Sequence, residues 1–379
     1  MKSLRILRVL RAGYYGLFRD FYRRNPFLKT LPYKEHKKRL IDFAPIHLNS
    51  FSECMRKIGH DCDEVITDLE SLQKSWAKEK DKPFGDFSWK DDILMEQIFA
   101  FKPEILYLQH INHFPRWLLR RLKVLVPSLK KIIIFTGFPS DPRNLSDVDM
   151  VLCAIPNIQK SFDEAGINTR LLYYYFDQNI LENLTSDELS IPLYSDEIEV
   201  SFLGYSGFGG QGEEHFSRYK LLDSILKNQN AKMWLTESST KATKVPEGSL
   251  PLKEKHPESC FSPCFGLDMY RILASSKISI NRHTDAANGN VGNMRMFEAT
   301  GMGSCLLTDS GNNLSDIFED GREVISYDSR EDCLEKLNFL KENHKVAKEI
   351  GEAGKQRVLK DHSLQKRCEL INEIVQEIV

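Results

Sequence analysis

The sequence lacks several features that would assign it at once to a class of protein. It contains no hydrophobic run long enough to span a bilayer. At its start, MKSLRILRVLRAG, the residues Arg5, Arg8 and Arg11 interrupt the apolar side chains, so this stretch does not form a signal-peptide core. We therefore expect a cytoplasmic protein. The net charge is only −2 over 379 residues, which disfavours a nucleic-acid-binding protein.

The sequence also lacks the cysteine pattern of a disulfide-bonded or zinc-binding domain. Its eight cysteines are scattered over the whole chain. His256, Cys260 and Cys264 lie close together, but Pro257 and Pro263 break the helix that would align them as ligands. No DxD motif follows a suitable strand. We therefore expect no metal site and no cofactor.

Short apolar runs alternate with helical periodicity along the chain, which is typical of an α/β protein. The length suits two domains. We assign residues 1–185 to a first domain, with strands expected at 4–10, 63–67, 105–109, 132–135, 150–153 and 169–174. Residues 186–197 are polar and are expected to form a linker. We assign residues 198–363 to a second domain, with strands expected at 198–204, 231–235, 277–281, 304–308 and 323–327.

Helices are predicted between most of these strands. One lies within 45–59, where Gly59 suits a C-terminal stop, and others cover 90–101, 115–126 and 158–164. In the second domain, helices are expected at 214–228, 269–275, 293–301, 314–318, 330–343 and 346–359, and residues 239–265 are expected to form an irregular loop. Residues 364–379 form a terminal helix with an apolar stripe. The simplest interpretation is that it packs on its own domain.

Charge is concentrated at the N-terminus, where residues 1–40 contain twelve basic residues against two acidic ones, Asp20 and Glu35. Aromatic residues alternate with the basic ones at Tyr14, Tyr15, Phe18, Phe21 and Tyr22. Such a surface suits an anionic membrane face or a phosphate-bearing acceptor. The simpler interpretation is a solvated surface.

Two predicted strand ends between residues 276 and 323 carry polar side chains. Asn281, Arg282 and His283 follow the first strand, and the loop from Thr308 to Asn313 follows the second. Open α/β sheets bind ligands beyond the carboxyl ends of their strands. A loop of small polar residues before a helix exposes backbone N–H groups that suit phosphate. The simpler interpretations are an ordinary turn and a helix cap.

Arg295 and Glu298 lie three residues apart on a predicted helix and therefore share a face. A carboxylate beside a phosphate site is unfavourable unless it accepts hydrogen bonds from hydroxyl groups, so we expect Glu298 to bind ribose. A surface ion pair is the simpler interpretation. Together these residues predict a site for a phosphorylated ligand whose ribose is bound by Glu298.

The run SKISINRHTD…GNVGNMRMFEATGMGSCLLTDSGNNLSDIFEDGREVISYDS resembles the C-terminal half of CgeB-like, group 1-type glycosyltransferases. The segments GEAGKQRVLKDHSLQKR and GYSG…HFSR fit the same pattern. The start of the chain is also similar to that family, in RILRV, FYRRNP, RKIGHDCDEVI and LQKSW. The resemblance therefore covers nearly the whole chain and is strongest from 266 to 367.

The resemblance implies a GT-B fold, in which two Rossmann-like domains face each other across a cleft. The C-terminal domain would bind a nucleotide-sugar donor and the N-terminal domain the acceptor. Glu298 matches the acid that binds donor ribose in the family. A second acid commonly precedes it by eight residues, where this chain has Asn290. The resemblance also implies a terminal helix that crosses back to the first domain.

The expected donor site contains Arg218, Asn281, Arg282, Asn290, Arg295, Glu298, Thr308, Asp309, Ser310, Gly311, Asn312 and Asn313. The glycine-rich loop 204–212 lies near the donor diphosphate or is a flexible surface loop. His110 follows a predicted strand and is the candidate catalytic base, although a structural histidine is the alternative. His283 is the second catalytic candidate and more simply contacts the donor.

We therefore predict a metal-independent glycosyltransferase of polysaccharide biosynthesis. It would use a nucleotide-sugar donor and a cell-surface glycan or lipid-linked acceptor, on the inner face of a membrane. The alternatives are a sugar-nucleotide epimerase on the same fold and a non-catalytic module that binds a nucleotide sugar.

Overall fold

The structure is a computed structural model that describes residues 2–13, 15–43, 48–109, 116–145, 147–185, 197–208, 213–236 and 249–379. Within these ranges, the side chains of 15–17, 20, 116, 213–215 and 285 are not described. The chain divides into two compact units. Unit 1 comprises Met1–Leu172 with Leu364–Val379, and unit 2 comprises Tyr173–Ser363.

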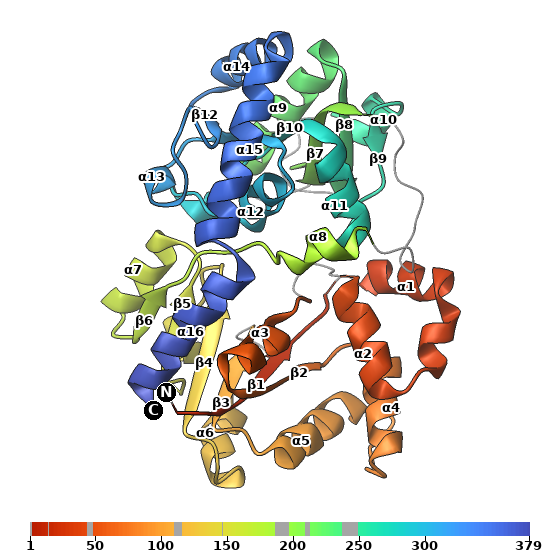
Figure 1. Cartoon of the computed structure of the whole chain (residues 1–379), viewed down its shortest axis with the longest axis vertical. Coiled ribbons are helices and arrows are strands. Elements are labelled where there is room, and N and C mark those ends of the chain that lie inside the picture. Colours follow the sequence, from red (N-terminus) through yellow and green to blue (C-terminus); the bar gives the residue numbers. More distant parts are fainter. Residues whose placement is uncertain are drawn as a thin grey trace. The chain divides into compact units, whose positions relative to one another are not determined.

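Unit 1 contains a six-stranded parallel sheet with the order β2-β1-β3-β4-β5-β6 (Figure 1). Both faces of such a sheet are covered, so its inner strands are mostly apolar. The strands β3 and β5, for example, are buried at every residue. The strands are β1 (Arg5–Leu10), β2 (Asp61–Ile66), β3 (Ile105–Leu108), β4 (Lys131–Thr136), β5 (Met150–Cys153) and β6 (Thr169–Leu171).

The helices of unit 1 include three that were not predicted, α1, α2 and α4. These helices are rich in charged residues and have one apolar face each. The predicted helix that ends at Gly59 is present, and Gly59 has a φ of +111°. The helices are α1 (Tyr15–Arg24), η1 (Pro26–Thr30), α2 (Tyr33–Asp42), α3 (Phe51–Ile58), α4 (Glu70–Glu79), α5 (Trp89–Phe101), α6 (Arg116–Leu125), η3 (Pro142–Leu145) and α7 (Pro156–Glu164).

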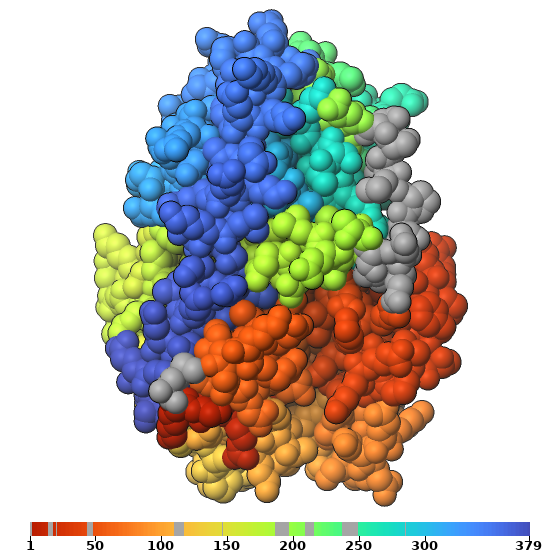
Figure 2. All heavy atoms as spheres, in the orientation of Figure 1, coloured from red at the N-terminus to blue at the C-terminus, as the bar shows by residue number. Residues whose placement is uncertain are grey.

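The terminal helix α16 (Leu364–Ile378) belongs to unit 1. It packs against α3, and Figure 2 shows its deep blue surface beside the orange surface of α3. Hydrogen bonds join His60 to Asn372 (2.9 Å) and Lys2 to Gln376 (3.2 Å). The buried residues Ile371 and Val375 supply the apolar stripe that was visible in the sequence.

Unit 2 contains a second six-stranded parallel sheet, with the order β12-β11-β10-β7-β8-β9. Its strands are β7 (Ile198–Tyr205), β8 (Ala231–Thr236), β9 (Cys260–Phe261), β10 (Ser276–Ile280), β11 (Cys305–Asp309) and β12 (Ile325–Tyr327). Its helices are α8 (Asn179–Asn183), α9 (Glu213–Asn228), α10 (Leu252–Lys255), α11 (Gly266–Ser275), η5 (Asp285–Ala287), α12 (Met294–Gly301), α13 (Leu314–Ile317), α14 (Arg330–Glu342) and α15 (His344–Asp361).

Two parts of unit 2 differ from the sequence-based expectation. The short elements α10 and β9 lie within 239–265, where an irregular loop was expected. Strand β9 has only two residues and exists because it pairs with β8. Residues 173–185, assigned to the first domain, cluster with unit 2. The Tyr173 hydroxyl accepts a hydrogen bond from Asn313 (3.2 Å), and Phe176 packs on Gly301.

Candidate functional site

The candidate site lies at the carboxyl edge of the unit 2 sheet, where the neighbouring strands β10 and β11 end. Asn281 follows β10 directly and is buried. Its amide donates to the Thr308 hydroxyl (3.0 Å), and its carbonyl oxygen accepts from the Asn293 amide (2.9 Å). The Tyr327 hydroxyl donates to the backbone oxygen of Asn281 (2.7 Å). The end of β10 is therefore fixed to β11, to β12 and to the start of α12.

His283 and Asp309 form the most fully hydrogen-bonded pair at this edge. The Nδ1 of His283 lies 2.8 Å from Asp309 Oδ1, and the backbone N–H of His283 donates to the same carboxylate (3.0 Å). The Nε2 of His283 accepts from the backbone N–H groups of Gly292 (3.0 Å) and Asn293 (3.2 Å). These hydrogen bonds indicate that the imidazole of His283 is neutral and is protonated at Nδ1. Both ring nitrogens of His283 are thus occupied by the protein.

The carboxyl of Asp309 is held in its ionised form. Burial alone would raise its pKa. The hydrogen bonds that His283 donates and the positive charge of Arg282 outweigh burial and lower the pKa of Asp309 below its ordinary value. A carboxylate at this place gives the His283 imidazole a fixed acceptor and so fixes its orientation.

The two loops that follow β10 and β11 are joined through Asn313. Its side-chain oxygen accepts from the backbone N–H of Val291 (2.8 Å), and its amide donates to the backbone oxygen of Val291 (2.9 Å). The backbone N–H of Asn312 donates to the oxygen of Gly289 (2.9 Å). A Cβ at Gly311 would lie 2.6 Å from Cγ1 of Val291, so a glycine is required where the loops meet.

Two arginines lie where β7 and β10 end. Arg218, from α9, is buried and donates to the backbone oxygens of Arg282 (2.6 Å) and Tyr205 (3.3 Å). Arg282 is half-buried and donates to the Ser217 hydroxyl (3.3 Å). The two guanidinium groups give this edge a concentration of positive charge.

The Arg295–Glu298 pair is buried, which excludes the simpler interpretation of a surface ion pair. Arg295 NH1 lies 2.8 Å from Glu298 Oε2, and Glu298 is only 4% exposed. Arg295 also donates to the backbone oxygen of Leu203 (3.2 Å). The Tyr270 hydroxyl lies 3.5 Å from Glu298 Oε1. Burial raises the pKa of Tyr270, and the negative charge of Glu298 raises it further.

The remaining predicted residues lie at the margin of this cluster or outside the described structure. The Asn290 amide donates to the oxygens of Ala287 (3.2 Å) and Asn288 (3.3 Å), so it closes the turn before α12. The Ser310 hydroxyl bonds Asp328. His110 and Gly209–Gly212 lie outside the described residues.

Several residues that hold the site were not predicted. Asn293 is the N-cap of α12 and accepts from Met296 N (3.2 Å), and its place before an apolar helix is a signal that sequence reasoning can use. Tyr173, Tyr270 and Tyr327 carry no such signal, because they reach the site from distant segments of the chain.

Two negative findings concern the described part of the chain. It contains no group of three or more His, Cys, Asp or Glu side chains arranged to hold a metal ion. Within the same residues, no helix is long and apolar enough to cross a membrane.

Comparison with known proteins agrees with this architecture. Residues 258–373 match a family model described as glycosyl transferase-like, a range that includes most of the site. No curated protein matches the chain in sequence.

Among solved structures, the chain is similar to a glycosyltransferase from Rickettsia africae (13% identity, 100% and 99% of the two chains, TM-score 0.59). It is also similar to Anabaena HepE in complex with UDP and glucose (12% identity, 99% and 100%, TM-score 0.58). A third similar structure is the sucrose-phosphate synthase of Thermosynechococcus elongatus (9% identity, 99% of each chain, TM-score 0.58). The prediction of an α/β protein of the GT-B class, with two Rossmann-like domains, is confirmed.

Proposed function

We propose that the protein is a glycosyltransferase that binds a nucleotide-sugar donor at the carboxyl edge of the unit 2 sheet. The observation that carries the proposal is the rigid polar edge itself. His283, Asp309, Asn281 and Asn313 join the two strand-end loops through hydrogen bonds within the protein. A site held in this way loses little conformational entropy when it binds. The glycosyl transferase-like family match covers these loops, and HepE binds UDP on a similar fold.

In this proposal, each part of the edge has a role in donor binding. Arg218, Arg282 and the backbone of residues 308–313 neutralise the diphosphate and stabilise the leaving nucleotide electrostatically without a metal ion. Glu298 accepts hydrogen bonds from the ribose hydroxyls. His283 acts as a positioning residue, because its Nε2 already accepts two backbone N–H groups and has no lone pair left for a substrate proton. His110 remains the candidate base.

We further propose that the acceptor is a cell-surface glycan or a lipid-linked intermediate, used at the cytoplasmic face of a membrane. Support comes from the basic residues of α1, where Arg19, Arg23 and Arg24 are all exposed. An anionic membrane surface attracts such residues by about 1 kcal/mol each.

The test begins with thermal shifts and calorimetric titrations of UDP, GDP and dTDP, together with their sugar conjugates. A ligand that binds only the folded state raises its stability by mass action. We expect one nucleoside diphosphate to bind, and slow hydrolysis of its sugar conjugate to persist in EDTA. Interconversion of the sugar nucleotide would favour an epimerase. Binding with neither hydrolysis nor transfer would favour a non-catalytic module.

Glu298→Ala is expected to weaken binding of the identified nucleotide by more than about tenfold, because a hydrogen bond to a charged group contributes roughly 1.5–3 kcal/mol. Glu349→Ala is the matched control, since Glu349 is an exposed glutamate on a helix of the same unit. Glu298→Gln keeps the side-chain shape and provides a second test if Glu298→Ala does not fold. Unchanged affinity in both folded Glu298 variants would remove this residue from the donor site.

A further inference from the structure

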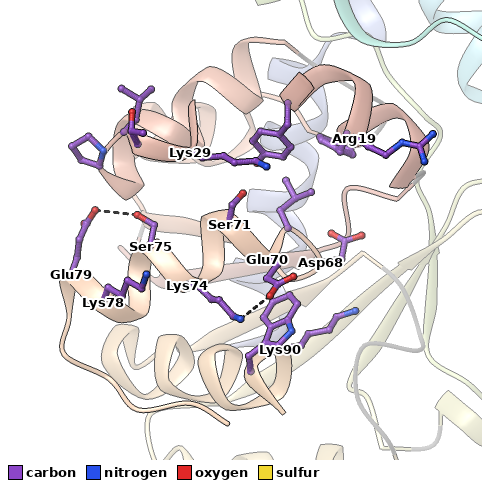
Figure 3. A pocket seen from close by; sticks show the side chains of 17 residues that line it. Arg19, Lys29, Asp68, Glu70, Ser71, Lys74, Ser75, Lys78, Glu79 and Lys90 are labelled. Carbon is purple, nitrogen blue, oxygen red and sulfur yellow. Dashed lines mark hydrogen bonds and ion pairs between the residues drawn. The ribbon is translucent and has the colours of Figure 1, made fainter. Parts of the chain in front are cut away.

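Unit 1 contains a cavity of about 1060 Å³ that is separate from the candidate donor site. Figure 3 shows it between an upper wall of helices, which carries Arg19 and Lys29, and a lower wall, which carries Lys74 and Lys78. The upper wall is formed by α1, η1 and the start of α2, and the lower wall by α4 and the start of α5. A volume of this size accommodates a small glycan.

The cavity lies at the carboxyl edge of the unit 1 sheet. Asp68 and Leu69, which line it, come two and three residues after the end of β2. The Asp68 carboxylate accepts from the backbone N–H groups of Ala12 (2.7 Å) and Gly13 (3.0 Å), just beyond the end of β1. The two strands are parallel and in register at Leu10 and Ile66. The carboxyl edge is where open α/β sheets bind their ligands.

The acidic side chains of the cavity are already engaged. Asp68 binds the two backbone N–H groups, and Glu70 pairs with Lys74 (2.7 Å). Glu79 accepts from the backbone N–H of Tyr33 (2.6 Å) and from Ser75 Oγ (3.4 Å). These bonds fix the walls. The cavity lining as a whole carries five basic residues and three acidic ones, so positive charge is in excess.

Four further cations line the cavity and form no ion pair with any residue whose structure is described: Arg19, Lys29, Lys78 and Lys90. They come from both walls, with Lys29 above and Lys90 below in Figure 3. Lys29 lies over the ring of Tyr22, 5.5 Å from its centroid. Several unpaired cations around one cavity produce a positive potential that attracts and binds an anionic ligand.

The walls also present aromatic and apolar side chains. Phe18, Tyr22, Leu31, Leu69 and Trp89 line the same space. Small-molecule sites typically combine apolar and aromatic walls with a few charged groups that fix the orientation of the ligand. A planar aromatic side chain suits the apolar face of a sugar ring, and the cations suit an acidic group attached to it.

We propose that this cavity binds the acceptor of the transferase, and that the acceptor is a sugar bearing a phosphate or a carboxylate. The inference rests on the proposed function, which supplies the reason for a second sugar site. It goes beyond that function by naming the charge of the acceptor and the side chains that recognise it. Lys29 and Lys90 bind the anionic group from opposite walls, and Tyr22 and Trp89 contact the ring.

The test is calorimetric titration of the intact protein with glucose 6-phosphate, glucuronate and glucose. We expect at least one of the two charged sugars to bind about tenfold or more tightly than glucose, since hydrogen bonds to ionised groups are the stronger ones. The two charged sugars distinguish a phosphate-bearing acceptor from an acidic one. Equal binding of all three sugars, or no binding of either charged sugar, would overturn the proposal.

Paired variants locate the binding to the cavity. The double variant Lys29→Gln with Lys90→Gln is expected to lower the affinity for the charged sugar by about tenfold. Lys34→Gln with Lys80→Gln is the control, because it removes the same charge from exposed lysines of unit 1 that do not line the cavity. Equal affinity in the two double variants would show that the bound sugar lies elsewhere, and the cavity proposal would be wrong.

Titration of UDP, GDP and dTDP into the same samples separates the two proposals. Nucleotide binding without binding of a charged sugar rejects the cavity proposal alone and leaves the donor site standing. If a charged sugar binds but none of the nucleotides binds, both the transferase function and the acceptor role of the cavity are rejected. We expect both ligands to bind, with the Lys29 and Lys90 substitutions affecting only the sugar.

Discussion

Each unit contains a cluster of buried polar side chains around one pair of residues, Arg8 with Glu64 in unit 1 and His283 with Asp309 in unit 2, and these two clusters occupy different places in similar sheets. In unit 1, Arg8 lies within β1, directly across from Glu64 of β2, and the two side chains are 1% and 2% exposed. Arg8 also donates to Asn49 (2.7 Å) and to Gln109 (2.8 Å). In unit 2, His283 and Asp309 lie at the ends of the strands and join loops rather than strands.

Because the two clusters occupy different positions in their sheets, they have different structural roles. The Arg8 cluster joins β1 and β2 to Gln109, which follows β3. Arg8 also lies over the ring of Phe51 on α3. The cluster therefore specifies how these elements pack. The His283 cluster fixes backbone at the edge where ligands bind, so it shapes a site. The unit 1 cavity differs again, because it is lined by long cationic side chains with few fixed contacts. We therefore expect unit 1 to tolerate a variable acceptor and unit 2 to require one donor shape.

The largest effect is expected for Arg8→Ala, which leaves the Glu64 carboxylate buried without its partner. Breaking a buried pair lowers the free energy of unfolding by about 3–5 kcal/mol. Urea unfolding with hydrogen exchange at β1 and β2 would measure this loss in unit 1. The double variant Arg8→Met with Glu64→Met removes both charges and is expected to lose less. Nucleotide affinity in unit 2 should stay unchanged. If Arg8→Ala lowers the free energy of unfolding by less than about 1 kcal/mol, the role assigned to Arg8 is wrong.

A smaller but more local effect is expected for His283→Ala. The substitution leaves the N–H groups of Gly292 and Asn293 without their acceptor, at a cost of about 1–3 kcal/mol, and it loosens the loop before α12. Nucleotide affinity measured by calorimetry should fall by at least about tenfold.

His256→Ala is the matched control for the His283 substitution. His256 also pairs with an aspartate, Asp223, at 2.8 Å, but this pair joins α9 to the residue after α10 and lies outside the loops after β10 and β11. The control should lower stability and leave nucleotide affinity unchanged. Equal nucleotide affinities in the two variants would remove the distinction between the site cluster and an ordinary ion pair.

The smallest effect concerns pH and unit 1. Burial lowers the pKa of His36 to about 4, and its Nε2 lies 2.8 Å from the Tyr22 hydroxyl. The unfolded chain takes up the proton near pH 6.5, whereas the folded chain resists it until about pH 4. The contribution of His36 is therefore complete above pH 6.5 and is lost progressively as the pH falls toward 4. Thermal unfolding at pH 7 and pH 5 should show this loss, and a His36→Gln variant with the same pH dependence would assign it to other groups.

Much of the fold was predictable because its signals are local. The buried strands β3 and β5 are continuous apolar runs, and the αL conformation at Gly59 ends α3 as predicted. The helices α1, α2 and α4 were not predicted, although their apolar and charged residues recur at the helical period. Strand β9 has two residues, which is too short for any pattern.

The candidate site was predictable in its residues but not in their contacts. Asn281, His283 and Asp309 could be placed at strand ends, since parallel strands bring such residues to one edge. That the Nε2 of His283 faces the start of α12 could not be inferred, because it depends on how a loop of ten residues folds back. The same is true of Asn313, which binds Val291 from 22 residues away.

The sequence by itself determined two series of strands and helices, the polar residues at the ends of β10 and β11, and the positive charge of the first forty residues. These are properties of neighbouring residues, and local periodicity and chemistry encode them. Only the tertiary structure decided that β7 lies between β10 and β8, that α16 packs in unit 1, and that Arg19, Lys29 and Lys90 surround one cavity. Those arrangements depend on the packing of distant segments, which no local pattern records.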